Sequence, residues 1–257
     1  MAEAVTAGTL AAQPGLAHGF FTRRGGVSGG GFAALNCSLS GRDDPDAVRE
    51  NRRRAADALG LPGAALVGLT QVHGSAVAVL DDPWPEDRRP QADAMVTRRP
   101  GLALGIVTAD CAPVLFADPE AGVIGGAHAG WRGAVGGVLE ATIEAMVAIG
   151  AGRARIIAAI GPCIRQPSYE VAADLRDAVL ARDPADARFF TDGARPDRWQ
   201  FDLAGYCAAR LRAAGVAVEV TPHDTLADEA RFFSHRRNTL AKGGPIGHQL
   251  SAIALMP

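Results

Sequence analysis

One thiol and two imidazoles stand in short segments made of small or turn-forming residues. Cys111 follows Thr-Ala-Asp, His128 is followed by Ala-Gly-Trp-Arg-Gly, and His73 lies within Gln-Val-His-Gly. One cysteine and two histidines can hold Zn²⁺ and leave its fourth coordination position open, as in catalytic rather than structural zinc sites. The pattern therefore predicts a shared metal site. The alternative is three unrelated buried or turn residues.

Two carboxylates lie near these candidate ligands in the sequence. Asp110 directly precedes Cys111, and Asp93 lies between His73 and Cys111. Either carboxylate could orient a histidine or carry a proton. The alternative for each is a turn-forming aspartate that accepts backbone hydrogen bonds. We take Asp110 as the candidate catalytic carboxylate.

Three further residues are candidates for binding phosphate or substrate. A helix is expected to begin just after Arg132, and free N–H groups and the helix dipole attract anions at such a start. Arg132 can add a bidentate contact, and Arg24 stands in a second Gly-rich turn. Gln71 precedes His73 by two residues and is the third candidate for binding phosphate or substrate. The alternative is that the glycines near Arg132 only permit close packing of a strand against a helix.

Apolar runs of strand length stand beside the candidate ligands. They cover residues 65–69, 76–80, 102–107, 114–117 and 123–127. If the runs over 102–107 and 123–127 pair, the residues that follow them lie at one rim of a sheet. Cys111 and His128 then share that rim, and the turn at His73 can reach it.

Helices are expected over 44–59 and 133–149. The first has Pro45 just inside its start and Gly60 just past its end, and the second has apolar residues at helical spacing. The remaining expected elements are strands over 156–160, 216–220 and 246–255 and a helix over 203–211. Strands and helices alternate without a low-complexity linker. The chain is therefore interpreted as one α/β domain over 1–257.

Composition excludes several classes of function. The 257 residues carry a net charge of −2, which gives no electrostatic reason to bind nucleic acid or an anionic membrane. No apolar run is long enough to span a membrane, and no signal peptide is evident. The triple arginine at 52–54 is interpreted as a solvated helix face. Of the four cysteines, Cys37 and Cys207 are expected in the core, and no disulfide is expected in a reducing cytoplasm.

Seven motifs together carry a resemblance to a known family. They are FTRRGGVSG from Phe21, QVHG from Gln71, ADCAP from Ala109, HAGWRG from His128, IGPCI from Ile160, YEV from Tyr169 and FFS from Phe232. In this order, and over essentially the whole chain, they resemble the YfiH family. That family is also called the laccase-domain or multi-copper polyphenol oxidoreductase family.

The resemblance implies a fold, a metal and an activity. The fold is an α/β (α+β) four-layer sandwich of mixed β-sheets, similar to the catalytic domain of cytotoxic necrotizing factor. The metal is Zn²⁺ rather than Cu²⁺, held by His73, Cys111 and His128. Members are described as purine nucleoside enzymes that phosphorolyse adenosine, inosine, guanosine and methylthioadenosine and deaminate adenosine. We therefore expect a cytoplasmic, monomeric enzyme whose partners are a nucleoside and phosphate.

Two alternative activities remain open on the sequence. Bacterial members are also linked to peptidoglycan editing, so Cys111 and His128 could form a cysteine hydrolase, although zinc would suppress the thiolate as a nucleophile. A copper oxidase could use the same ligands with Met95 as an axial group. A laccase needs more histidine ligands than the six histidines present.

The chain departs from the family pattern near its end. Asp224 stands where members often carry cysteine, and His248 follows Gly247 where arginine is common. These changes affect the outer pocket and leave the expected zinc ligands in place.

Overall fold

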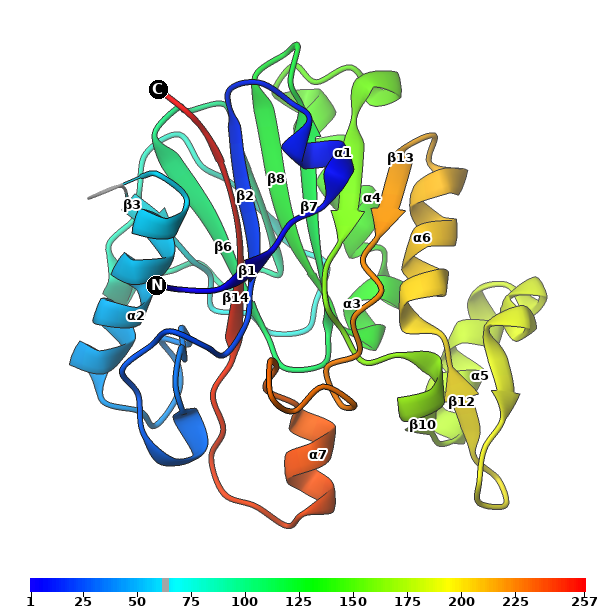
Figure 1. Ribbon diagram of the computed structural model, residues 1–257. Helices are drawn as coiled ribbons and strands as arrows, with labels where there is room; N and C mark the ends of the chain where they lie inside the picture. The colour runs from blue at the N-terminus through cyan, green and yellow to red at the C-terminus, as the bar shows by residue number, and fades with distance from the viewer. Residues whose placement is uncertain (62–64) are drawn as a thin grey trace.

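Two β-sheets stacked face to face form the centre of the protein, which the computed structural model describes over residues 1–61 and 65–257 (Figure 1). The five-stranded sheet runs in the order β1 (Ala4–Val5), β2 (Leu16–Phe21), β14 (Gln249–Leu255), β6 (Leu102–Thr108) and β3 (Ala65–Val67). The six-stranded sheet runs in the order β13 (Ala217–Val220), β9 (Ile157–Ile160), β7 (Ala112–Asp118), β8 (Val123–Ala129), β5 (Ala94–Thr97) and β4 (Val77–Val79). Both sheets contain parallel and antiparallel pairs.

A third, smaller sheet and seven α-helices accompany the two large sheets in the described residues. The three-stranded sheet has the order β10 (Glu170–Val171), β12 (Trp199–Phe201) and β11 (Phe190–Asp192). The helices are α1 (Gly8–Ala11), α2 (Pro45–Ala58), α3 (Trp131–Gly136), α4 (Val138–Ala148), α5 (Ala173–Arg182), α6 (Leu203–Ala213) and α7 (His235–Leu240). None of the helices in the described ranges has the length and apolar character that a membrane crossing needs.

Apolar side chains fill the space between the two large sheets. Leu104 and Ile106 of β6, Leu115 of β7 and Ile124 of β8 belong to one fully buried cluster. All seven residues of β7 and of β8 are buried, because both faces of the six-stranded sheet are covered. The near-continuous apolar character of these strands follows from that double coverage.

Helices cover the two outer faces. On the five-stranded sheet, Ala55 of α2 packs with Phe21 and Leu250. On the six-stranded sheet, α4 and α6 pack through residues such as Ile143 and Cys207. Helix α2 therefore lies on one side of the stacked sheets, and α4 and α6 lie on the other (Figure 1). The predicted mixture of helices with mixed sheets is confirmed.

Local signals explain where the helices begin and end. The Asp44 carboxylate accepts the Asp46 amide at the start of α2, Pro45 occupies its first position, and Gly60 follows it with φ of 75°. The helix predicted over 133–149 is instead two helices, α3 and α4. Gly137 ends the first with φ of 92°, a conformation that glycine adopts without strain.

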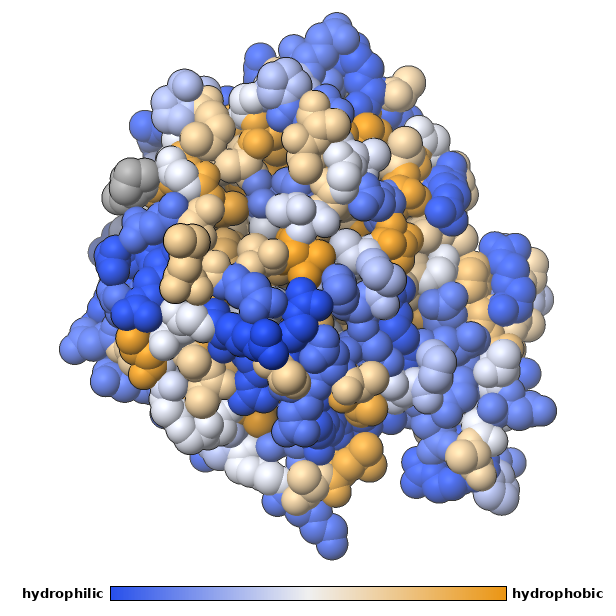
Figure 2. Space-filling model, viewed as in Figure 1, coloured by the Kyte–Doolittle hydropathy of each residue, from blue (hydrophilic) through white to orange (hydrophobic). Residues whose placement is uncertain are grey.

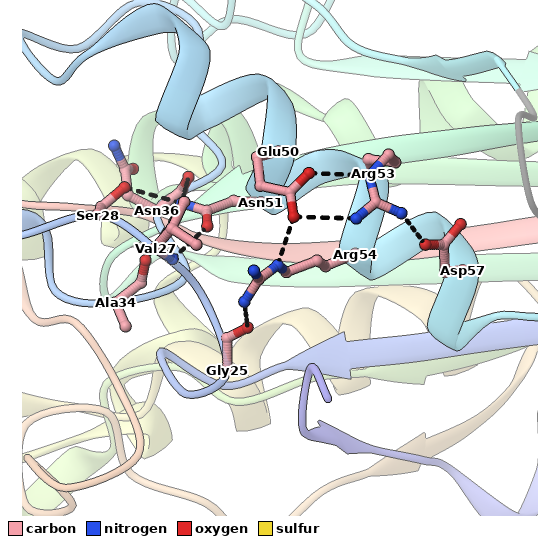
Figure 3. Close-up of polar contacts among 10 residues, drawn as sticks. All are labelled: Gly25, Val27, Ser28, Ala34, Asn36, Glu50, Asn51, Arg53, Arg54 and Asp57. Carbon is pink, nitrogen blue, oxygen red and sulfur yellow. Dashed lines mark hydrogen bonds and ion pairs between the residues drawn. The ribbon is translucent and has the colours of Figure 1, made fainter.

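The three consecutive arginines of α2 do not share one environment. Arg53 pairs with Glu50 and Asp57, and Arg54 pairs with Glu50, at the helix surface (Figure 3). Hydrophilic residues cover this region of the molecule, with apolar ones scattered among them (Figure 2). Arg52 is instead only 8% exposed. The prediction of a solvated face is therefore wrong for Arg52, because α2 turns this residue toward the five-stranded sheet.

The predicted partners of the strand before Cys111 are also wrong. Strand β6 pairs with β14 and β3, whereas β8 belongs to the other sheet and pairs with β7 and β5. The runs over 102–107 and 123–127 therefore face each other across the core instead of pairing. Both are fully apolar, so their pattern does not show which sheet each one joins.

Candidate metal centre

The three predicted ligands converge in space. One ligand atom each from His73, Cys111 and His128 lies within 4.8 Å of the others. The Cys111 Sγ and His73 Nε2 atoms are 4.0 Å apart, and the two imidazole centroids are 4.7 Å apart at an interplanar angle of 80°. A thiol and two imidazoles this close form a donor set that could hold one metal ion.

Antiparallel pairing of β7 with β8 brings Cys111 to His128. His128 lies opposite Pro113, and Cys111 directly precedes Ala112, the first residue of β7. Gly130 lies at the centre of the cluster. A Cβ atom there would be 3.0 Å from His73 Cδ2 and 3.1 Å from Cys111 Sγ. A side chain at position 130 would therefore crowd two of the three ligands.

Asp93 organises both histidines. Its carboxylate accepts hydrogen bonds from the backbone N–H groups of Val72, His73 and Gly74, at 3.1, 2.9 and 2.6 Å. The same carboxylate lies 2.7 Å from Nδ1 of His128, which leaves Nε2 of that ring for a metal. His73 has φ of 61°, so these bonds hold a backbone conformation that is uncommon for residues other than glycine. Asp93 is thus the carboxylate that positions both histidines of the cluster.

Asp110 holds a different part of the chain. Its carboxylate accepts hydrogen bonds from the Thr225 hydroxyl at 2.6 Å, the Ser234 hydroxyl at 3.0 Å and the Arg236 amide at 2.6 Å. Asp110 has φ of 92°, so the turn before Cys111 is also held in an uncommon conformation. The carboxylate therefore ties the Cys111 turn to the start of α7.

Electrostatics favour a thiolate in this cluster. Burial acts to raise the pKa of the Cys111 thiol, but the charges of and hydrogen bonds from His128 and His73 outweigh it and lower the pKa to about 6. Burial acts to lower the pKa of His128, whereas Cys111 and Asp93 raise it to about 9. The pKa of Cys37 and of Cys163 is raised to about 12 by burial. Cys111 is therefore the thiol prepared for metal binding.

The cluster opens into a cavity of about 590 Å³. Along its lining, the Arg132 guanidinium lies over the Trp131 ring at 4.3 Å, and the Arg236 guanidinium lies over the Tyr169 ring at 5.4 Å. Residues from many segments line it, among them Cys37, Ser38, Ser40, Arg52, Gly68, Gln71, Val107, Asp110, Trp131, Arg132, Tyr169, His235, Arg236 and His248. Aromatic rings, guanidinium groups and the candidate ligands thus face one space.

The remaining predicted site residues divide into two groups. Arg132 and Gln71 line the cavity, although both amide atoms of Gln71 bond the backbone of Val107. Arg24 is not among the described residues that line it; its side chain donates to the Ala230 carbonyl and to Glu3. The structure therefore does not bring Arg24 to the ligands.

Several residues that line the cavity were not predicted as site residues, among them Tyr169, Arg236 and Arg52. Tyr169 begins the YEV motif, and Arg236 lies two residues after the FFS motif. His248, whose departure from the family pattern was expected to affect the outer pocket, also lines the cavity. Its Nδ1 atom has no hydrogen-bond partner among the described residues, and burial, with the charges of neighbouring histidines, lowers its pKa to about 4. A neutral imidazole therefore faces the cavity near the ligands.

Asp224, the other departure from the family pattern, is held by hydrogen bonds within the protein. Its carboxylate accepts the Ser168 hydroxyl at 2.6 Å and the Leu226 amide at 2.9 Å. The backbone of Asp224 bridges to Cys163, which is fully buried. All four cysteines of the chain are described, and all are free.

Several similarities place the chain among known proteins. Residues 17–256 match the family described as multi-copper polyphenol oxidoreductase laccase. The purine nucleoside phosphorylase ORF3 of Streptomyces griseus is 45% identical over 235 residues, which cover 87% of this chain and 90% of that protein. A crystal structure of a Neisseria meningitidis protein matches with a TM-score of 0.84 and 33% identity, over 100% of this chain and 99% of that one. The YfiH protein of Bacillus licheniformis matches with a TM-score of 0.86 and 29% identity, over 93% and 92%.

Proposed function

This chain belongs to the laccase-like YfiH family, and we propose that it is a zinc-dependent purine nucleoside phosphorylase. The observation that carries the proposal is the convergence of His73, Cys111 and His128 at a cavity lined by aromatic and arginine side chains. Relatives named purine nucleoside phosphorylase support the choice of substrate.

The donor set fits zinc. One thiolate and two neutral imidazoles are ligands that Zn²⁺ prefers, and three protein ligands leave a position for water or substrate. Gly130 provides the space in which the ligands meet, and Asp93 fixes the ring of His128. A bound zinc ion would supply Lewis-acid chemistry and a water molecule of lowered pKa.

The cavity fits a nucleoside. A volume of about 590 Å³ lies in the range that binds small molecules. Trp131 and Tyr169 supply aromatic surface that suits a purine, and Arg132 and Arg236, which lie over these rings, supply positive charge. Phosphorolysis joins a phosphate oxygen to C1′ and breaks the bond from C1′ to N9. The electron pair of that bond leaves with the purine, which takes up a proton. Positive charge in the cavity assists because an anion attacks and an anion departs.

Asp110 enters this proposal as a positioning residue. Three donors already bond its carboxylate, so its role is to hold the Cys111 turn in place. Adenosine deamination is proposed as a second reaction of the same site, in which water adds to C6 of the purine and ammonia leaves.

Two ligand variants test the proposal. Cys111→Ala and His73→Ala should reduce the metal content, measured by elemental analysis, from about one zinc per chain to near zero. Both should abolish the release of hypoxanthine and ribose 1-phosphate from inosine. His73 is an exposed ligand, so its replacement leaves the core intact. A panel of adenosine, inosine, guanosine and methylthioadenosine, with and without phosphate, separates phosphorolysis from deamination.

His223→Ala is the matched control, because this half-buried imidazole is not among the described residues that line the cavity. It should retain zinc and turnover. Unchanged phosphorolysis in the Cys111 variant would reject the assignment, and copper in place of zinc would reject the choice of metal.

A cysteine hydrolase acting on a peptidoglycan precursor is the second candidate. The observation that favours it is the approach of His73 Nε2 to 4.0 Å from the Cys111 thiol, which is the pairing that nucleophilic cysteines use. A hydrolase of this kind works without metal. Hydrolysis of the precursor that rises when a chelator removes zinc would favour the hydrolase. Phosphorolysis of inosine that falls under the same treatment would favour the phosphorylase.

A further inference from the structure

The inner wall of the cavity contains a buried guanidinium. Arg52 lines the cavity and is only 8% exposed. Its Nη1 and Nη2 donate to the carbonyl oxygens of Cys37 and Leu66, at 3.3 and 2.7 Å. These acceptors are neutral, and no carboxylate of the described residues forms an ion pair with Arg52.

The next two residues of the same helix show the usual arrangement. Arg53 and Arg54 each bond the Glu50 carboxylate, and Arg53 also reaches Asp57 (Figure 3). These pairs lie near solvent, where a charge needs little compensation. Arg52 has no such partner although it is the most buried of the three. A buried charge is costly unless an opposite charge accompanies it.

Charged groups of both signs lie near this wall. Burial lowers the pKa of Arg52, and Arg89 acts in the same direction, while Cys37 and Glu86 act against it. Arg89 donates to the Ser40 hydroxyl at 3.4 Å. Glu86 lies 3.9 Å from Arg49, so its charge is shared with another arginine.

Small residues keep the space beside Arg52 open. Ser38, Ser40 and Gly41 line the cavity in one loop, and Gly68 lines it from the end of β3. A Cβ atom at Gly68 would lie 3.5 Å from Nη2 of Arg52. Hydroxyl groups, a guanidinium and an uncrowded backbone together make a surface that suits an oxyanion.

We propose that Arg52, with Ser38 and Ser40, forms an anion subsite that binds a phosphate group inside the cavity. The same cavity reaches His73, Cys111 and His128, so one ligand or two adjacent ligands can contact both ends. The phosphate is either the inorganic co-substrate or an ester group on the sugar of a nucleotide. That the anion is phosphate, rather than another oxyanion, rests on the proposed phosphorolysis.

Arg132 and Arg236 are placed differently from Arg52. Their guanidinium groups lie over aromatic rings, and Arg236 also donates to the Glu170 carbonyl at 2.7 Å. They suit contacts to a purine or to a departing group. Arg52 is the one of these three arginines whose charge is enclosed by the protein without a ring beneath it.

Binding measurements on the zinc-loaded protein test the subsite without requiring turnover. Titration calorimetry follows inorganic phosphate and adenosine 5′-monophosphate in separate experiments. Arg52→Gln should lower the affinity for the anion that the wild type binds by about tenfold or more, because a charge-assisted bidentate contact is lost. Arg53→Gln, the matched control on the same helix, should bind as the wild type does.

A second variant protects the test against misfolding, since Arg52 also bonds two backbone carbonyls. Ser40 is exposed, lines the same cavity as Arg52 and bonds Arg89, so Ser40→Asp adds a negative charge to the proposed subsite without disturbing the core. It should weaken the binding of the same anion and leave the melting temperature unchanged. Stronger binding of the monophosphate than of free phosphate assigns the subsite to a nucleotide ester, and the reverse assigns it to the co-substrate.

The proposal is overturned if Arg52→Gln, folded as judged by circular dichroism, and Ser40→Asp both bind as the wild type does. It is also overturned if the wild type binds neither anion at millimolar concentration. Phosphate binding that depends on Arg52 in a protein without nucleoside turnover would keep the subsite and reject the proposed function. The two failures are therefore distinguishable.

Discussion

Two of the three candidate metal ligands, His73 and Cys111, lie in turns, and each turn is held by one buried aspartate. Asp93 bonds three backbone amides of the His73 turn and the ring of His128. Asp110 bonds residues that begin α7 or precede it by about ten positions, and makes no described hydrogen bond to a candidate ligand. The same type of side chain therefore orients donors in one turn and attaches a distant segment in the other.

The difference follows from the elements around each turn. Asp93 precedes β5, which pairs with β8, so its carboxylate comes directly behind His128. Its backbone carbonyl also accepts the His128 amide at 2.7 Å. Asp110 stands between β6 and β7, where the chain crosses from one sheet to the other. That crossing faces α7 and the segment before it, which supply the donors. Loss of each aspartate should therefore have distinct effects.

The largest effect is expected for Asp93→Ala. Removing a carboxylate that fixes a metal-bound histidine weakens metal binding by about 10- to 100-fold. The pKa of Asp93 is lowered, since the hydrogen bonds from His128, Gly74 and Val72 outweigh burial. The carboxylate is therefore charged, and stabilises the fold, at neutral pH. Competition with a chromogenic zinc chelator measures the affinity. A variant that holds zinc as tightly as the wild type would contradict this role.

A smaller effect on the metal is expected for Asp110→Asn. Asparagine tolerates the left-handed backbone at this position, so the turn before Cys111 is retained. Its amide cannot accept all three hydrogen bonds, and the free energy of unfolding should fall by about 1–3 kcal/mol. Urea denaturation measures the loss, while chelator competition should show nearly unchanged zinc affinity. A loss of affinity equal to that of Asp93→Ala would remove the distinction between the two turns.

The smallest effect is expected for Thr225→Val, which removes one donor to Asp110 and keeps the shape of the side chain. Thermal unfolding should show that the free energy of unfolding falls by about 1 kcal/mol. Zinc content and turnover should match the wild type. A variant that loses zinc would show that the segment before α7 supports the metal more directly than its contacts indicate.

The candidate ligands could be identified from the sequence because their signals are local. Cys111 and His128 stand beside small residues in short motifs, and Gly130 is part of the same segment. The bounds of α2 were also readable, since Asp44, Pro45 and Gly60 act within one turn of the helix ends. Capping and turn conformations depend on neighbouring residues, so a single sequence contains them.

The tertiary structure decided which sheet each strand joins and where each polar side chain points. The apolar runs of β6 and β8 have the same pattern, yet they lie in different sheets. Arg52 and Arg53 are identical neighbours, yet only one lines the cavity. Asp93 and Asp110 are likewise distinguished by what packs against them, and the one farther from the ligands in sequence is the one that bonds them. Such outcomes depend on contacts between segments far apart in the chain, and no local pattern encodes those contacts.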